Sequence, residues 1–226
     1  MREADLDQAV RELRYGRTKI CGLTTPDDAR AALHAGATHG GVMFALESPR
    51  RISMERAEVV RRAAPLHWVG VFANQPPKDI AAAAAQLGLS AVQLHGSEAP
   101  DEVRRVRALL PSGCEVWKAF RVQQRIPGRS ETGADRLLLD GWTASKLGGT
   151  GRPFDWTLLD RYPELGEVVL AGGLNAGNVD RAAALNTWGL DVSSGVESAP
   201  GTKDPGKLQQ FFAARRRIPG RGGSLR

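Results

Sequence analysis

The sequence is poor in cysteine and histidine, and it contains no long apolar run. Its two cysteines, Cys21 and Cys114, lie far apart, which argues against a disulfide framework and favours a reducing compartment, the cytoplasm. The longest apolar runs have the length of strands, so we expect no membrane-spanning helix. The segment from Met1 to Tyr15 is charged and lacks an apolar core, so we do not expect it to be a secretory signal.

Two further absences exclude classes of site. No Gly-x-Gly-x-x-Gly follows the first apolar run, so the dinucleotide-binding fingerprint is missing. The histidines do not converge on the ends of the predicted strands, so we expect no metal site; they are His34, His39, His67 and His95.

The positive charge is confined to one end of the chain. The net charge is +6, and residues 215–226 contain five arginines and no acid. The rest is therefore near neutral, and we expect 215–226 to be a disordered basic tail without a nucleic-acid partner. We expect residues 1–16 to be a helical extension. No apolar surface strip is evident in the sequence, which favours a monomer.

Strand-like and helix-like segments alternate through residues 17–214. The expected strands span 18–21, 40–45, 68–73, 91–95, 115–120, 136–140, 168–171 and 190–193, and Thr25, Ser53, Ser97 and Asn175 are expected helix caps. Eight such units in 226 residues predict one (β/α)₈ barrel, with a fifth helix that is short or missing and a short helix over 156–162. A doubly wound sheet is the alternative, but it does not need eight units.

Polar residues gather where these strands end, which is where barrels place their chemistry. Cys21 follows Lys19 on one face of the first strand, and Asp140 ends the run Leu137-Leu138-Leu139. A buried carboxylate there costs several kcal/mol unless it is paired or used. The alternatives are a small buried apolar residue for Cys21 and a capping or ion-paired carboxylate for Asp140. Cys114 begins the fifth strand, at the opposite end, and is expected to be structural.

Gly-rich turns follow the seventh and eighth strands, where barrels often bind phosphate through backbone N–H groups. The candidate phosphate-binding residues are Gly172, Gly173, Ser193, Ser194 and Gly195. The alternative is a pair of ordinary tight turns. Another Gly-rich segment, 148–151 with Gly149, is a candidate mobile cover.

Two more candidates lie on the same end of the barrel. Arg50, next to Arg51, follows the second strand and can hold a carboxylate through two parallel hydrogen bonds, although a surface arginine is the simpler interpretation. His95 shares a face with Gln93 and is a candidate ligand or acid–base group.

Taken together, these segments resemble the phosphoribosylanthranilate isomerase family of tryptophan biosynthesis. The matching segments appear in the family's order over residues 18–211: Lys19-Ile20-Cys21-Gly22-Leu23-Thr24, Ser48-Pro49-Arg50, Val69-Gly70-Val71-Phe72, Val92-Gln93-Leu94-His95-Gly96, Leu138-Leu139-Asp140, Gly148-Gly149-Thr150-Gly151, Phe154-Asp155-Trp156, Ala171-Gly172-Gly173-Leu174-Asn175 and Asp191-Val192-Ser193-Ser194-Gly195-Val196-Glu197.

The resemblance implies an Amadori rearrangement of N-(5-phosphoribosyl)anthranilate without a metal or cofactor. It implies Cys21 as general base, Asp140 as general acid and Arg50 as the contact to the substrate carboxylate, with His95, Asp191 and Gly149 close to the substrate. An acid that protonates the ribose ring oxygen and a base that removes the proton from the adjacent carbon suffice for this reaction.

Three alternatives stay open. The first is another phosphosugar isomerase or epimerase barrel; the thiol at Cys21 argues against the histidine-pathway isomerase, which has an aspartate there. The second is the use of two substrates. The third is a barrel that binds nucleic acid through its basic tail, which would show salt-dependent binding.

Overall fold

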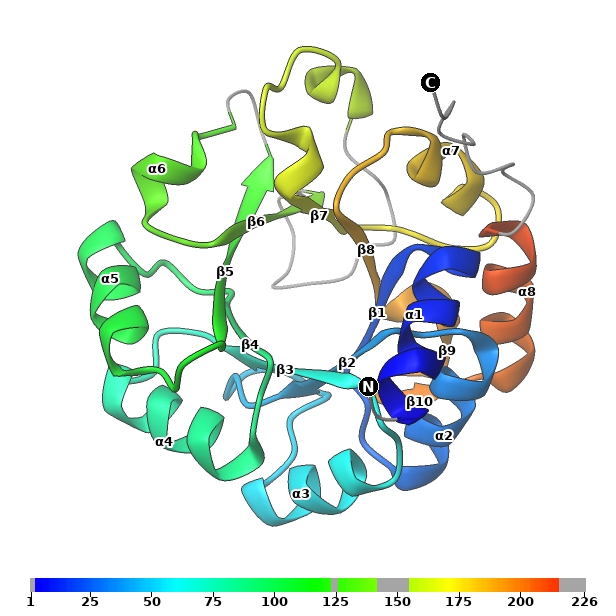
Figure 1. Ribbon diagram of the computed structural model, residues 1–226, viewed down its shortest axis with the longest axis horizontal. Helices are drawn as coiled ribbons and strands as arrows, with labels where there is room; N and C mark the ends of the chain where they lie inside the picture. The colour runs from blue at the N-terminus through cyan, green and yellow to red at the C-terminus, as the bar shows by residue number, and fades with distance from the viewer. Residues whose placement is uncertain (1–2, 123–125, 142–154, 216–226) are drawn as a thin grey trace.

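Eight parallel strands close into a barrel in chain order (Figure 1). The computed structural model describes residues 3–122, 126–141 and 155–215. The strands are β1 (Arg17–Cys21), β2 (His39–Met43), β3 (His67–Phe72), β4 (Ala91–Leu94), β5 (Glu115–Val122), β6 (Arg136–Gly141), β7 (Val168–Leu170) and β8 (Gly189–Val192). The barrel closes because β1 pairs with both β2 and β8, so the predicted fold is confirmed.

Helices cover the outside of the barrel (Figure 1). They are α2 (Pro26–Ala35), α3 (Met54–Arg62), α4 (Pro77–Leu87), α5 (Pro100–Leu109), α6 (Arg129–Thr132), α7 (Val179–Ala184) and α8 (Pro205–Arg215). The expected short fifth helix is α6, which has four residues. After β6 the described chain forms two 3₁₀ turns, η1 (Trp156–Leu159) and η2 (Leu165–Glu167), where an ordinary short helix was expected.

Two predicted helix caps are wrong, because their side chains form hydrogen bonds with loop residues at the mouth of the barrel. Ser97 donates through its N–H and its hydroxyl to Asn74 Oδ1, and α5 begins at Pro100 instead. Asn175 donates to the carbonyl of Gly173, and the residue before α7 is Asn178. Thr25 and Ser53 do cap their helices, each accepting a backbone N–H three residues on.

The chain after β8 differs most from the expected pattern. A 3₁₀ turn, η3 (Ser194–Val196), leads into a small antiparallel hairpin of β9 (Glu197–Ala199) and β10 (Thr202–Lys203) before α8 begins. The turn of the hairpin uses Gly201 at φ 83°, a backbone conformation that glycine adopts without a Cβ clash. The hairpin brings Lys203 back to the carboxyl end of β1, where its ammonium donates to the carbonyl of Cys21.

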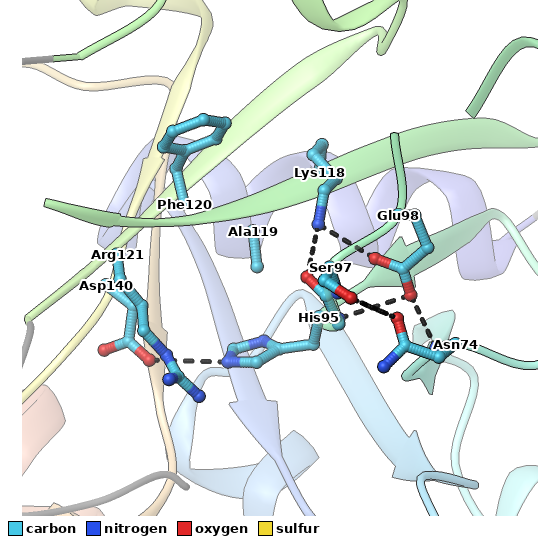
Figure 2. Close-up of a pocket in the computed structure, with 10 residues that line it drawn as sticks. Asn74, His95, Ser97, Glu98, Lys118, Ala119, Phe120, Arg121 and Asp140 are labelled. Atoms are coloured by element: carbon cyan, nitrogen blue, oxygen red, sulfur yellow. Dashed lines mark hydrogen bonds and ion pairs between the residues drawn. The ribbon is translucent and has the colours of Figure 1, made fainter. Parts of the chain in front are cut away.

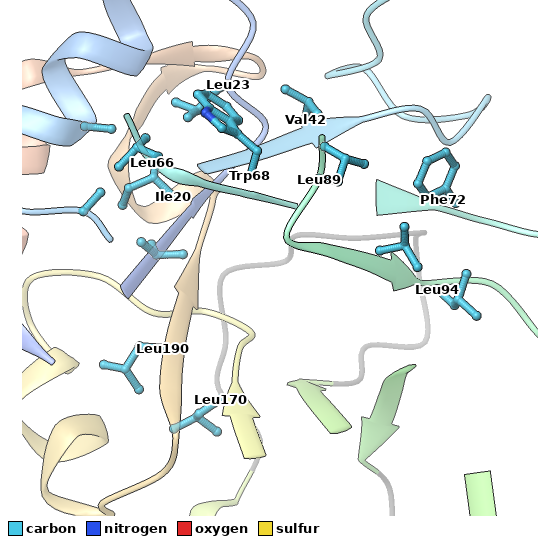
Figure 3. Close-up of a cluster of buried hydrophobic side chains, with 14 of the residues drawn as sticks. Ile20, Leu23, Val42, Leu66, Trp68, Phe72, Leu89, Leu94, Leu170 and Leu190 are labelled. Carbon is cyan, nitrogen blue, oxygen red and sulfur yellow. The ribbon is translucent and has the colours of Figure 1, made fainter. Parts of the chain in front are cut away.

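The larger core fills the space between barrel and helices, and Figure 3 shows part of it. Successive residues of each strand point to opposite faces, so Ile20 and Val42 join this outer core while their neighbours face the axis. The inner face is filled by a smaller cluster around Trp117 and Leu138. Burial of this kind contributes about 25 cal/mol per Å² of apolar surface and supplies most of the stabilisation.

The amino-terminal end of the barrel is closed by aromatic rings and two arginines. His39 packs against Trp117 and Trp188, with ring centroids 5.9 and 5.5 Å away. The guanidinium carbons of Arg17 and Arg136 lie 5.1 and 3.9 Å from the ring centroid of Trp188. Cations over an indole ring are attracted by its π electrons, so this layer is stabilised by more than apolar area.

Residues Glu3–Tyr15 form α1, which is attached to the barrel at several points. Gln8 donates to the carbonyl of Thr38, and the rings of Tyr15 and Phe212 pack edge to face at 5.4 Å. Arg215, which the expected tail included, is the last residue of α8 and donates to the Tyr15 carbonyl. Residues 216–226 lie outside the described part of the chain.

One expectation about the surface is wrong. Leu6, Val10 and Leu13 of α1 are 51%, 53% and 89% exposed and lie on one helical face. The monomer was expected because no apolar surface strip was evident in the sequence. Because α1 carries such a strip, that reason for expecting a monomer does not hold. Within the described ranges, no helix combines the length and the apolar character needed to cross a bilayer.

We predict that His39 makes the fold acid-sensitive. Burial, reinforced by His67 and nearby cations, lowers the pKa of His39 to about 3, whereas an unfolded histidine titrates near pH 6.5. Between these two pH values, His39 is protonated in the unfolded chain but not in the folded chain. The free energy of unfolding therefore decreases by up to about 4 kcal/mol as the pH drops from about 6.5 towards 3. Denaturant unfolding of His39→Gln should show a flatter pH dependence than the unmodified chain, and His34→Gln, on the exposed end of α2, should not. Parallel pH dependence of His39→Gln and the unmodified chain would contradict this account.

Candidate active site

The carboxyl ends of the strands enclose a cavity of about 620 Å³. Most of the residues predicted for the site line it: Cys21, Arg50, His95, Asp140, Gly172, Gly173, Asp191, Ser193 and Ser194. Gly195 is not among the lining residues; its Cα faces the carbonyl of Leu174 so closely that a Cβ would lie 1.9 Å from that oxygen. Gly149 lies outside the described residues, so its predicted place near the substrate stays a prediction.

The floor of the cavity is an ion pair inside the barrel. The Lys19 ammonium lies 2.9 Å from Asp191 Oδ2 and 2.8 Å from Gln93 Oε1, and the Lys19 side chain is 2% exposed. Gly41 leaves the space for it, since a Cβ there would lie 2.9 Å from Lys19 Cε. Burial alone would lower the pKa of Lys19, but Asp191 and Cys21 outweigh burial and the pKa is raised. Lys19 is therefore a permanent positive charge beneath the cavity.

A chain of polar contacts leads from Lys19 to Asp140. Because the Gln93 oxygen accepts from Lys19, its amide nitrogen faces His95 Nδ1, 2.9 Å away. His95 Nδ1 must then accept, which places the ring proton of a neutral imidazole on Nε2. That nitrogen lies 3.5 Å from Asp140 Oδ2. The side chain of Asp140 is 19% exposed and reaches the cavity without being sealed from water.

Cys21 lies on β1, and β7 and β8 separate it from Asp140 on β6 by the shorter way round the barrel. Burial raises the pKa of Cys21 above its ordinary value, and Lys19 lowers it without cancelling the rise. Lys19 thus favours the thiolate, as its predicted position implied, but the raised pKa means that the thiol keeps its proton at neutral pH. Cys114, at the opposite end, is buried too, and burial raises its pKa to about 11.

Arg50 and its neighbour Arg51 take different places. Arg50 lines the cavity with a side chain that is 14% exposed, and it makes two hydrogen bonds to Glu197, from Nε at 2.8 Å and from Nη2 at 2.7 Å. Arg51 is exposed and does not line the cavity. Of the two, only Arg50 is placed to meet a ligand there.

The turns after β7 and β8 present backbone to the cavity. Gly172 and Gly173 have φ values of 84° and 67°, which a residue with a Cβ rarely adopts. Asn175 and Asn178 donate to the Gly173 carbonyl at 3.0 and 2.9 Å. Because C=O and N–H of a trans peptide point in opposite directions, the N–H of Leu174 is turned away from both asparagines. Such a fixed donor suits an anion.

A side pocket of about 450 Å³ adjoins the cavity next to His95 and Asp140 (Figure 2). Its wall is a buried ion pair between Lys118 and Glu98, 2.8 Å apart. Lys118 also donates to the carbonyl of Gly96, and Glu98 accepts from the backbone N–H of Asn74. This pair fixes the loops after β3 and β4, and with them the place of His95.

Several residues that organise the site were not predicted. The sequence analysis assigned no role to Glu98, Lys118 or Lys203. It included Glu197 only as the last residue of the segment 191–197 that resembles the family. Lys203 lies in a segment without apolar periodicity, so nothing in the sequence marked it. Among the residues that the structure describes, no three His, Cys, Asp or Glu side chains are grouped to hold a metal ion.

Fold and site together define a class of protein: a (β/α)₈ barrel with a thiol and a carboxyl group on separate strands of one mouth and glycine-containing turns after β7 and β8 that line the same cavity. The model of the N-(5'-phosphoribosyl)anthranilate isomerase family matches residues 18–214. The chain belongs to this family.

Relatives of two lengths are similar to the chain. The tryptophan biosynthesis protein TrpCF of Vibrio cholerae is 48% identical over 212 residues, which cover 94% of this chain and 45% of TrpCF. The chain thus spans about half the length of these TrpCF relatives. The N-(5'-phosphoribosyl)anthranilate isomerase of Rubrobacter xylanophilus is 41% identical over 88% of this chain and 98% of its own length.

Solved structures give the same result. The phosphoribosyl anthranilate isomerase of Thermus thermophilus superposes with a TM-score of 0.78 at 36% identity and covers 88% of this chain and 97% of its own. Another isomerase of this name, in complex with reduced 1-(o-carboxyphenylamino)-1-deoxyribulose 5-phosphate, has a TM-score of 0.71 at 32% identity and covers 89% of this chain and 99% of its own.

We predict that alkylation of Cys21 is controlled by its raised pKa. The thiolate is the reactive form, so iodoacetamide labelling followed by mass spectrometry should accelerate through the range from about pH 7 to about pH 10 without levelling off near neutrality. Cys114→Ser should keep this pH dependence in the labelling of the Cys21 peptide, and Cys21→Ser should lose that labelled peptide. A labelling rate that is already maximal at neutral pH would contradict this prediction, because it would show that Cys21 is a thiolate in the protein without added substrate.

Proposed function

We propose that the chain isomerises N-(5-phosphoribosyl)anthranilate to 1-(2-carboxyphenylamino)-1-deoxyribulose 5-phosphate, a step of tryptophan biosynthesis. The observation that carries this proposal is the arrangement of Cys21 and Asp140 on separate strands of one mouth, between Arg50 and the turns after β7 and β8. The isomerase complex with a reduced aminodeoxyribulose phosphate supports a substrate of this chemistry. Because both cysteines are free thiols, we propose a reducing compartment, the cytoplasm.

The substrate is proposed to span the cavity between two anion sites. Its phosphate lies on the backbone of Gly172 and Gly173 and of Ser193 to Gly195, where N–H groups are the available donors. Its carboxylate meets Arg50 near the end of β2. The ribose between them then lies over Lys19 and Asp191, with Cys21 on one side and Asp140 on the other.

The chemistry consists of two proton transfers. Asp140 gives its proton to the ribose ring oxygen, the ring C–O bond breaks, and the nitrogen lone pair forms the C=N bond of an iminium ion. Cys21 first loses its own proton, which Lys19 favours, and as thiolate it removes the proton from the adjacent carbon; the electron pair of that C–H bond forms the C=C bond of the enolamine, and the π pair of the C=N bond returns to nitrogen. Tautomerisation of the enol gives the ketone of the product. Each group contributes about 10²–10⁴-fold in such steps.

We predict that Cys21→Ala and Asp140→Asn each reduce kcat by at least about 10²-fold with the fold intact, because each removes one proton-transfer group. The measurement is turnover of phosphoribosylanthranilate by purified protein in the presence of a chelator. Cys114→Ala is the matched control and should keep kcat close to that of the unmodified chain, since Cys114 lies at the opposite end of β5. Normal turnover by Cys21→Ala would mean that another residue is the base.

We predict that Arg50 and Arg51 differ strongly in their effect on binding. Arg50→Ala should weaken binding of the substrate by about 2–5 kcal/mol, as expected when one partner of a desolvated, hydrogen-bonded charge pair is removed. Arg51→Ala should change the KM little, because Arg51 is exposed outside the cavity. The opposite order in measured KM values would reassign the carboxylate contact to Arg51.

A further inference from the structure

Beneath Arg50 lies a buried ion pair that the proton transfers do not use. Glu197 begins β9 and Lys203 ends β10, and their side chains are 4% and 0% exposed. Lys203 Nζ lies 2.8 Å from Glu197 Oε1. Burial of two charges is unfavourable unless each is well paired, so the position of this pair next to the cavity needs an explanation.

Glu197 fixes the direction of the Arg50 guanidinium. Its two oxygens accept from Nε and Nη2 of Arg50, which occupies one edge of the planar group. The guanidinium has five N–H donors, so Nη1 and the second hydrogen of Nη2 remain as the edge for a ligand carboxylate. The Arg50 stem also lies on Gly22, where a Cβ would be 2.5 Å from Arg50 Cδ. Arg50 is thus clamped directly beside Cys21.

Lys203 connects this clamp to the strand that carries Cys21. Its ammonium donates to the carbonyl of Cys21 at 2.6 Å, and the carbonyl of Ser193 lies 3.4 Å away. Burial would raise the pKa of Glu197, but Arg50 and Lys203 outweigh burial and lower it. Glu197 therefore stays ionised, and the opposite charges of Glu197 and Lys203 leave Arg50 as the uncompensated charge of the group.

We propose that Glu197, anchored by Lys203, is a positioning residue that presents one fixed edge of Arg50 to the carboxylate of the substrate. This role rests on the proposed function, because it requires a substrate with a carboxylate. A purely structural role for the pair, in which it holds the β9–β10 hairpin at the mouth of the barrel, is the competing explanation. The two explanations differ in whether loss of Glu197 matters only for substrates with a carboxylate.

The test compares two substrates, phosphoribosylanthranilate and phosphoribosylaniline, which lacks the carboxylate. Glu197→Gln should raise the KM for phosphoribosylanthranilate about tenfold, the loss that corresponds to one charge-assisted hydrogen bond, and change kcat little. It should leave the KM for phosphoribosylaniline unchanged. In the Arg50→Ala background, Glu197→Gln should have no further effect on either KM, because the residue acts through Arg50.

The chain offers a matched control and a second variant. Glu98→Gln alters the other buried glutamate–lysine pair, at the carboxyl end of β4, and should change the kinetics of both substrates alike. If Glu197→Gln fails to fold, Arg50→Lys provides the test. Lysine keeps the positive charge, but its ammonium has no second planar edge with which to bind a ligand while the first binds Glu197. It should raise the KM for phosphoribosylanthranilate nearly as much as Arg50→Ala does.

The proposal is overturned if Glu197→Gln affects both substrates equally or adds fully to Arg50→Ala, or if Arg50→Lys keeps the KM of the unmodified chain. These results are distinct from failure of the proposed function, in which the unmodified chain turns over neither substrate.

Discussion

The contact on which the mouth of the barrel depends is the ion pair between Lys19 and Asp191. An ammonium with almost no exposure to water is tolerated only because a carboxylate and an amide oxygen accept its hydrogen bonds. The hydrogen bond from Lys19 fixes which way the Gln93 amide points, and the Gln93 amide nitrogen in turn fixes the tautomer of His95. Lys19 also opposes, without cancelling, the effect of burial on the pKa of Cys21. Its replacement would therefore disturb the β1, β4 and β8 sides of the cavity together.

Two further buried ion pairs at the same end of the barrel have the same arrangement of contacts. Lys118 with Glu98 and Lys203 with Glu197 each bury a lysine that donates to backbone carbonyls at the end of a strand. Strand ends leave carbonyls without sheet partners, and a buried ammonium can satisfy more than one of them. The cavity wall is thus held by charges, which fix side chains and loops together, where an apolar wall would leave the loops free to shift.

The sequence was sufficient for the barrel, and most of the site residues predicted from it line the cavity. Short apolar strands alternate with capped helices, and Cys21, Asp140 and the glycines at 172 and 173 follow strands directly, so their place follows from the fold. The contacts that orient these residues were beyond sequence reasoning. Arg50 and Glu197 are 147 residues apart, and Lys203 and Cys21 are 182 residues apart, without a local pattern that links either pair. The two caps failed for different reasons: Ser97 bonds to Asn74 in the loop after β3, which local spacing does not reveal, and Asn175 bonds within its own turn, to Gly173 and Gly177, so that α7 begins later.

The structure of this chain with the reduced aminodeoxyribulose phosphate bound is the most direct test of the proposed arrangement. The account predicts the phosphate on the backbone of Gly172, Gly173 and Ser194, the carboxylate on the Nη1 edge of Arg50 with Glu197 still on the opposite edge, and the reacting carbon next to Cys21 Sγ. A bound ligand whose carboxylate lies in the side pocket by Arg121, with Arg50 making no contact to it, would contradict the account.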